Sequence, residues 1–160
     1  MRNTSGFTVF ELTIVLAIMG IVASIAVPSF SRWRGEAKMR SAVNIMRGDL
    51  EVAKSRAVRE NDFVAVNFVA TGYTIFIDDN AGGGGTAGDN IHDSGEQLLI
   101  DRQLAAGISI DLANTTFAGN QTRFNGRGRI GNQGVVTLVN STGAESEIGI
   151  TNRFGRITVN

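Results

Sequence analysis

A single carboxylate interrupts the most apolar part of the chain. From Phe7 to Phe30 the only charged side chain is that of Glu11. A carboxylate in such a segment must pair with a positive group or take up a proton, because an isolated charge is costly in an apolar environment. Glu11 therefore indicates a functional site in which the carboxylate is either paired with a cation or protonated.

Catalytic side chains are sparse elsewhere. His92 is the only histidine, and Asp93 and Ser94 follow it directly beside a glycine-rich stretch. Neighbours on one loop do not make a triad, because triad members converge in space. The other carboxylates are scattered singly and no cysteine is present. We expect a solvated loop histidine, no catalytic residues and no cofactor.

The glycine-rich stretch covers residues 78–90. It lacks the Lys-Ser/Thr pair that a phosphate-binding P-loop needs. The oxygens of Asp78, Asp79, Asn80 and Asp89 could bind calcium, but their spacing is not that of an EF-hand. We expect an exposed, mobile loop without a metal and leave calcium as the alternative.

Arginines gather in the last third of the chain. Arg127 and Arg129 alternate with glycines at 126–129, and Arg156 follows Gly155. Small residues between arginines allow guanidinium groups to approach a phosphate backbone. The fifteen basic and fifteen acidic residues cancel, however, so no bulk attraction to nucleic acid follows. Contact with DNA and simple solvation both remain open for these side chains.

The segment that carries Glu11 is long enough to cross a membrane. About twenty helical residues span a hydrocarbon core of about 30 Å, and the apolar run from Phe7 to Phe30 exceeds that length. A cleaved secretory signal is the alternative, with residues 23–26 as its processing site. The run is longer than a usual signal core, which favours an anchor.

A second helical segment follows the anchor. Small and apolar residues recur every three or four positions and predict one buried face of an amphipathic helix over 31–61; they are Met39, Ala42, Met46, Leu50, Ala53 and Ala57. Asn61 and Asp62 should end the helix. Pro28 removes a helical hydrogen bond, so we expect a modest kink there and not a break.

Beyond residue 62 the pattern alternates with a period of two. About seven strands are expected between 63 and 160, beginning with a hairpin of 63–69 and 73–77. A chain of 160 residues suits one domain plus an anchor. The predicted fold is α+β: a long N-terminal helix packed against a mostly antiparallel β-domain over 62–160.

The N-terminus resembles the type IV pilin superfamily. The resemblance rests on Gly6-Phe7-Thr8-Val9-Phe10-Glu11, the apolar helix and Pro28. It implies that prepilin peptidase removes residues 1–6, cutting between Gly6 and Phe7, and methylates the new amine of Phe7. Residues 7–30 would then be the transmembrane and filament-core helix, in which Glu11 pairs with the Phe7 amine of a neighbouring subunit.

Later segments are similar to the GspH/FimT family. These segments are residues 49–61, the Phe-Asn-Gly-Arg-Gly at 124–128 and Gly155-Arg156-Ile157, with Lys54 where the family usually has arginine. The resemblance implies a minor pseudopilin of a type II secretion system or a minor pilin of a type IV pilus. A DNA-binding minor pilin of natural transformation and a major pilin are the alternatives.

The resemblance also implies partners and a location. The partners are other pilin or pseudopilin subunits, prepilin peptidase, the inner-membrane assembly platform and, before assembly, the inner membrane. The chain would be a single-pass inner-membrane protein with a periplasmic C-terminal domain, and later part of a periplasmic or cell-surface filament. In DNA-capturing relatives a Gly-Arg-x-Arg element near the C-terminus is implicated; here the intact element lies at 126–129, about thirty residues before Gly155-Arg156.

Overall fold

The computed structural model describes residues 8–81, 83, 85–151 and 154–160. The chain separates into two units, residues 1–34 and residues 35–160. Helix α1 contributes to both units, and all the described strands belong to the second.

Helix α1 runs from Val9 to Glu60. Its start is set by Thr8, whose side-chain oxygen accepts a hydrogen bond from the Glu11 amide at 3.2 Å. The helix ends where Asn61 adopts a φ of 56° and the Asp62 amide donates back to the Ala57 carbonyl. An asparagine in the left-handed region is a common helix stop. The expected end at Asn61-Asp62 is confirmed.

The strands form two antiparallel sheets. The first sheet has the order β3-β2-β1-β5, and the second has the order β4-β6-β7-β8. The strands of the first sheet are β1 (Val64–Val69), β2 (Gly72–Ile77), β3 (Leu98–Gln103) and β5 (Gln121–Phe124). Those of the second are β4 (Ile108–Asp111), β6 (Gly134–Asn140), β7 (Glu145–Thr151) and β8 (Arg156–Val159).

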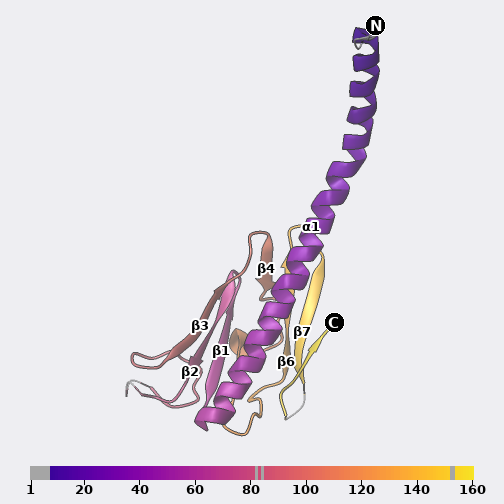
Figure 1. The fold of residues 1–160 in the computed structure, drawn as a ribbon. Helices are drawn as coiled ribbons and strands as arrows, with labels where there is room; N and C mark the ends of the chain where they lie inside the picture. Colours follow the sequence, from indigo (N-terminus) through magenta and orange to yellow (C-terminus); the bar gives the residue numbers. More distant parts are fainter. Residues whose placement is uncertain (1–7, 82, 84, 152–153) are drawn as a thin grey trace. The chain divides into compact units, whose positions relative to one another are not determined.

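One hydrophobic core joins the helix to both sheets. The six residues of the predicted helical stripe are all buried, and Met46, Leu50, Ala53 and Ala57 are completely so. They share a cluster with side chains from the first sheet, such as Tyr73 and Phe124, and from the second, such as Leu138. Figure 1 shows the C-terminal half of α1 lying across both sheets. The predicted α+β fold, a helix on antiparallel sheets, is therefore confirmed.

The strand count differs slightly from expectation. The described residues contain eight strands, where about seven were expected. The turn at residues 104–107 carries the chain from one sheet to the other, because β3 and β4 belong to different sheets. The strand sequences do not encode this choice of partner. It follows from long-range contacts such as the hydrogen bond from the Ile110 amide to the Ala70 carbonyl.

Candidate functional site

Glu11 lies in the first turn of α1, with its side chain exposed. A carboxylate is favourable here because the free amides of a helix N-terminus carry partial positive charge. Thr8 and Glu11 have the spacing of a capping box, and this signal in the sequence could have fixed the start of the helix. Gly6 and Phe7 lie outside the described residues. Cleavage between them and the pairing of Glu11 stay predictions.

The residues after Glu11 expose an almost continuous apolar surface. Large apolar side chains from Val9 to Val27 are 42% to 80% exposed. The 18-residue window of highest hydropathy in α1 has a mean of 2.4, and none of it is buried. By length and composition this part of α1 can cross a membrane, although a signal sequence near an N-terminus meets the same test.

The helix is not broken at Pro28. Helical structure continues through residues 9–60 without interruption. The kink assigned to Pro28 stays a prediction.

Asn125 shapes the loop that carries Arg127 and Arg129. The Asn125 side-chain oxygen accepts hydrogen bonds from the backbone amides of both arginines, each at 3.0 Å. Position 126 requires glycine, because an added Cβ would lie 2.7 Å from the Asn61 backbone. Position 128 favours glycine, because its φ is 66°. The two arginine side chains are exposed. The Phe-Asn-Gly-Arg-Gly segment thus builds a tight loop that directs two cations to solvent.

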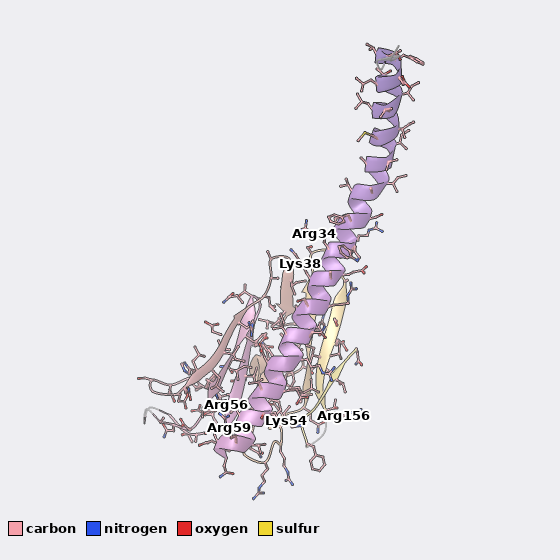
Figure 2. All side chains as sticks on the ribbon, viewed as in Figure 1. Arg34, Lys38, Lys54, Arg56, Arg59 and Arg156 are labelled. Atoms are coloured by element: carbon pink, nitrogen blue, oxygen red, sulfur yellow. The ribbon has the colours of Figure 1, made fainter. Side chains whose placement is uncertain are left out.

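This loop meets the turn before β8 and the last turns of α1. A Cβ on Gly155 would lie 3.2 Å from the Gly128 carbonyl oxygen. The Lys54 Nζ donates to the Gly155 carbonyl at 3.1 Å, and Figure 2 shows Lys54 close to Arg156. Arg127 and Arg129 in this loop and Arg156 at the start of β8 thus lie on two segments in contact, although the segments are distant in sequence. We call these three arginines and Lys54 the basic junction.

The neighbouring cations are already engaged. Arg56 and Arg59 both pair with Glu60, at 2.9 Å and 3.1 Å. Arg123 lies over the Phe63 ring, 5.2 Å from its centroid. Within the described part of the chain, Arg127, Arg129 and Arg156 form no ion pair. Within the described residues, the three arginines of the basic junction are therefore exposed and without an ion pair, whereas its Lys54 is bonded to the Gly155 carbonyl.

Asp78 organises the glycine-rich loop from inside. Its carboxylate is fully buried and accepts hydrogen bonds from the Gly88 amide at 2.7 Å and the Asn90 amide at 2.8 Å. Burial raises the pKa of Asp78, while the two backbone donors oppose that rise. Most described residues of this loop are exposed, as expected, although Asp78 and Gly88 are buried; the mobility of the loop stays a prediction. Both Asp78 oxygens point at amides, which leaves them poorly placed for calcium.

Glu96 and His92 complete this loop. Glu96 is buried and accepts hydrogen bonds from the amides of Asn80 and Asp93. His92 is exposed as expected, yet its ring packs edge-on against Phe76 at 5.0 Å and contacts the Glu96 carbonyl. No hydrogen bond between His92 and Asp93 or Ser94 occurs among the described residues.

A polar network between α1 and the first sheet was missed by sequence reasoning. Asp49 accepts a 2.7 Å hydrogen bond from the Tyr73 hydroxyl and hydrogen bonds from Arg102 at 3.0 Å and 3.3 Å. Burial raises the pKa of Tyr73 well above its usual range, and the hydrogen bond to Asp49 raises it further. Only the position of Asp49, next to the buried Leu50, hinted that its side chain lies at the edge of the interface.

The long N-terminal helix packed against antiparallel sheets matches the type IV pilin fold. Residues 42–153 match the family described as Type II transport protein GspH, and residues 1–27 match the prokaryotic N-terminal methylation motif. The chain belongs to the GspH family. It is a type IV pilin-like protein of the minor pilin and pseudopilin type, and such proteins are structural subunits.

Individual relatives agree with this assignment. The fimbrial protein EcpC of Eikenella corrodens is 36% identical over 70 residues, which are 41% of this chain and 46% of the relative. The pilin-like protein PilA1 of Thermus thermophilus is 35% identical over 82 residues, or 48% of this chain and 49% of the relative. The chain thus matches about half the length of these relatives.

Among solved structures, the type IV minor pilin FimU of Pseudomonas aeruginosa matches with a TM-score of 0.57 at 15% identity. The match covers 80% of this chain and 92% of FimU. At this identity the similarity shows that the fold is shared.

Proposed function

We propose that this chain is a minor subunit of a type II secretion pseudopilus or a type IV pilus. In this proposal prepilin peptidase removes residues 1–6, and the subunit leaves the inner membrane to enter a filament through α1. The observation that carries the proposal is the exposed apolar surface of residues 9–27 with Glu11 as its one charge.

The physical role of Glu11 follows from that surface. Exposed apolar side chains are stable in lipid or against similar helices, so a filament core can replace the bilayer. The Glu11 carboxylate then needs a cation, and the methylated amine of Phe7 in a neighbouring subunit is the proposed partner. Breaking a buried ion pair by removing one charge costs about 3–5 kcal/mol.

Substitution of Glu11 by glutamine tests the proposal. Glu11→Gln keeps the size of the side chain but cannot ionise, so we expect incorporation into sheared filaments to fall by well over about tenfold. Thr13→Val is the matched control, because within the described part of the chain the Thr13 hydroxyl bonds only to the Phe10 carbonyl of its own helix, and it carries no charge. Both variants should remain in the membrane fraction.

The same filaments separate the alternatives. A minor subunit is rare relative to the main filament protein, whereas a major pilin would predominate along the filament. The mass of the incorporated subunit reports whether residues 1–6 have been removed. Unchanged incorporation of Glu11→Gln would contradict the proposed role of the carboxylate and favour a membrane-anchored domain outside any filament.

A second candidate function, DNA binding in natural transformation, is supported by the basic junction. The intact Gly-Arg-x-Arg element lies far in sequence from Gly155-Arg156, but the two loops are in contact. The lack of ion pairs for Arg127, Arg129 and Arg156 within the described residues leaves them available to phosphate. The zero net charge opposes this function.

A further inference from the structure

A small aromatic and cationic cluster follows the apolar surface of α1. The rings of Phe30 and Trp33 stack with their centroids 5.9 Å apart and an interplanar angle of 29°. The Arg34 guanidinium lies 5.8 Å from the centroid of Phe30. The spacings of three and four residues place all three side chains on one face of the helix. Phe30 and Trp33 are 57% and 58% exposed, so this cluster presents a large amphipathic surface.

The position of the cluster along α1 matches the boundary of a bilayer. The 21 residues from Val9 to Ser29 rise about 30 Å, which is the thickness of a hydrocarbon core. Phe30, Trp33 and Arg34 then fall at the level of the lipid headgroups. Tryptophan concentrates at this level because its ring is apolar and its N–H is polar.

The charge of Arg34 is available to a ligand. Within the described residues neither Arg32 nor Arg34 forms an ion pair. Contact with the face of the Phe30 ring orients the Arg34 guanidinium, and its N–H groups can still donate to an acceptor. A planar guanidinium donates two parallel hydrogen bonds to a phosphate, and these bonds are strong because both groups are charged.

We propose that Phe30, Trp33 and Arg34 form a binding site for the headgroup of an anionic phospholipid. The site fixes the depth of the helix in the membrane before assembly. Arg34 binds the lipid phosphate, while the two rings cover the glycerol and upper acyl region. The inference rests on the proposed membrane anchoring of α1 and adds a lipid partner at its outer end.

Arg32 provides a matched control within the same turn. At 3.6 residues per turn, Arg32 lies about 160° around the helix axis from Phe30. It is exposed like Arg34, but no ring contact involving Arg32 occurs among the described residues. Arg32→Gln and Arg34→Gln therefore remove the same charge at nearly the same depth, and only Arg34→Gln disrupts the cluster.

The test uses the full chain in nanodiscs of phosphatidylcholine, with and without phosphatidylglycerol. After extraction in detergent, the lipids that remain bound are measured by mass spectrometry. An arginine near an anionic surface contributes about 1 kcal/mol, which corresponds to about fivefold enrichment of phosphatidylglycerol. We expect that enrichment in the wild type and in Arg32→Gln, and its loss in Arg34→Gln. Phe30→Leu, which keeps every charge, should lose part of it.

Trp33 is the only tryptophan, so its fluorescence reports directly on the cluster. Quenching by brominated lipids should be stronger when bromine lies near the glycerol than when it lies near the end of the acyl chain. Its emission should also shift to shorter wavelength when phosphatidylglycerol is present. Membrane extraction and circular dichroism establish that each variant is inserted and helical. If Arg34→Gln does not insert into the membrane, the phosphatidylglycerol enrichment of Phe30→Leu decides whether the cluster binds the lipid.

Three results would overturn the inference. These are equal loss of enrichment in Arg32→Gln and Arg34→Gln, no enrichment in the wild type, and strongest quenching of Trp33 from the bilayer centre. If the Trp33 emission wavelength does not change with phosphatidylglycerol and shifts only on filament assembly, the cluster is instead a contact between subunits. Failure of the wild-type chain to remain in membranes is a different outcome, because it contradicts the membrane anchoring within the proposed function.

Discussion

The hydroxyl of Tyr73 shows how one polar group can tie a helix to a sheet. Tyr73 is buried in β2 and donates to Asp49 of α1, which Arg102 of β3 also contacts. A buried hydroxyl needs a partner, and the negative charge of Asp49 makes this one strong. The same surroundings disfavour the phenolate, because it would lie buried beside a carboxylate.

Tyr73 should therefore resist ionisation in the folded protein. Its pKa is raised above the unfolded value of about 10, so the folded state keeps the proton longer. The stability that this proton gives is complete below about pH 10 and decreases as the pH rises further. Tyr73 is the only tyrosine. We expect phenolate absorbance of residues 35–160 to appear only together with cooperative unfolding.

Tyr73→Phe isolates the contribution of the hydroxyl. It should lower the free energy of unfolding by about 1 kcal/mol at neutral pH and flatten the decline of stability above about pH 10. A phenolate that titrates near pH 10 while the circular dichroism stays native would contradict the role given to Asp49.

Among the elements, the glycine-rich loop depends most on single side chains. Its amides point inward to Asp78 and Glu96, and Gly88 packs beside Phe63. Gly88 has a φ of 80°, which a residue with a Cβ rarely adopts. The loop is thus shaped by buried carboxylates as well as by glycine.

Asp78→Ala should destabilise the β-domain by about 1–3 kcal/mol, because the Gly88 and Asn90 amides lose their acceptor. Asp79→Ala is the matched control: Asp79 is exposed, and among the described residues its side chain accepts only from the nearby Ala81 amide, so its loss should cost no more than about 0.5 kcal/mol. Urea unfolding of residues 35–160 measures both. Equal effects of the two substitutions would contradict the role of Asp78.

The pKa of Asp78 determines whether the protein gains or loses stability as the pH falls. Burial raises its pKa in the folded state, so the folded protein takes up this proton first. Relative to Asp78→Asn, the wild type should gain stability as the pH falls from about 7 toward the unfolded pKa of about 3.8. A relative loss of stability over that range would show that the two backbone donors outweigh burial.

The elements differ in how far the sequence determines them. The stripe from Met39 to Ala57 and the hairpin of β1 and β2 follow from local periodicity, so both were predictable. The separation of β3 from β4 depends on long-range contacts such as that of Ile110 with Ala70. The burial of Asp78 was hidden as well, because a cluster of acidic residues and glycines is also typical of exposed loops. The arginines were identified from sequence, but their contact through Gly128 and Gly155 was not.

At the scale of the whole molecule, the positive and negative charges cancel, but they are unevenly distributed over the surface. The chain has no net charge, yet the exposed arginines of the basic junction gather near the end of α1, while acidic residues recur separately in the segment 78–96. Association with a polyanion would therefore depend on a few contacts and on salt. This is the regime in which individual arginines are decisive.

The DNA-binding candidate predicts a specific salt response. In residues 35–160, replacing both Arg127 and Arg129 by glutamine should abolish most binding to duplex DNA at low salt and reduce the slope of log affinity against log salt by about two. Arg40→Gln is the control, since Arg40 pairs with Glu36 about 21 Å along the helix from Lys54. Gel-shift titrations at low and physiological salt measure both. If the double variant bound DNA with wild-type affinity, the basic junction would be excluded as the DNA-binding surface.

The side-chain bonds along α1 also determine how the β-domain carries load. Lys38 donates to the Ala106 carbonyl, Asp49 binds Tyr73 and Arg102, and Lys54 donates to the Gly155 carbonyl. These attachments span 16 residues, or about 24 Å of helix. A force along the helix axis would load these hydrogen bonds and the buried stripe in parallel, because helix and sheets would have to slide past one another. Contacts that are loaded in parallel resist force better than contacts that break one after another.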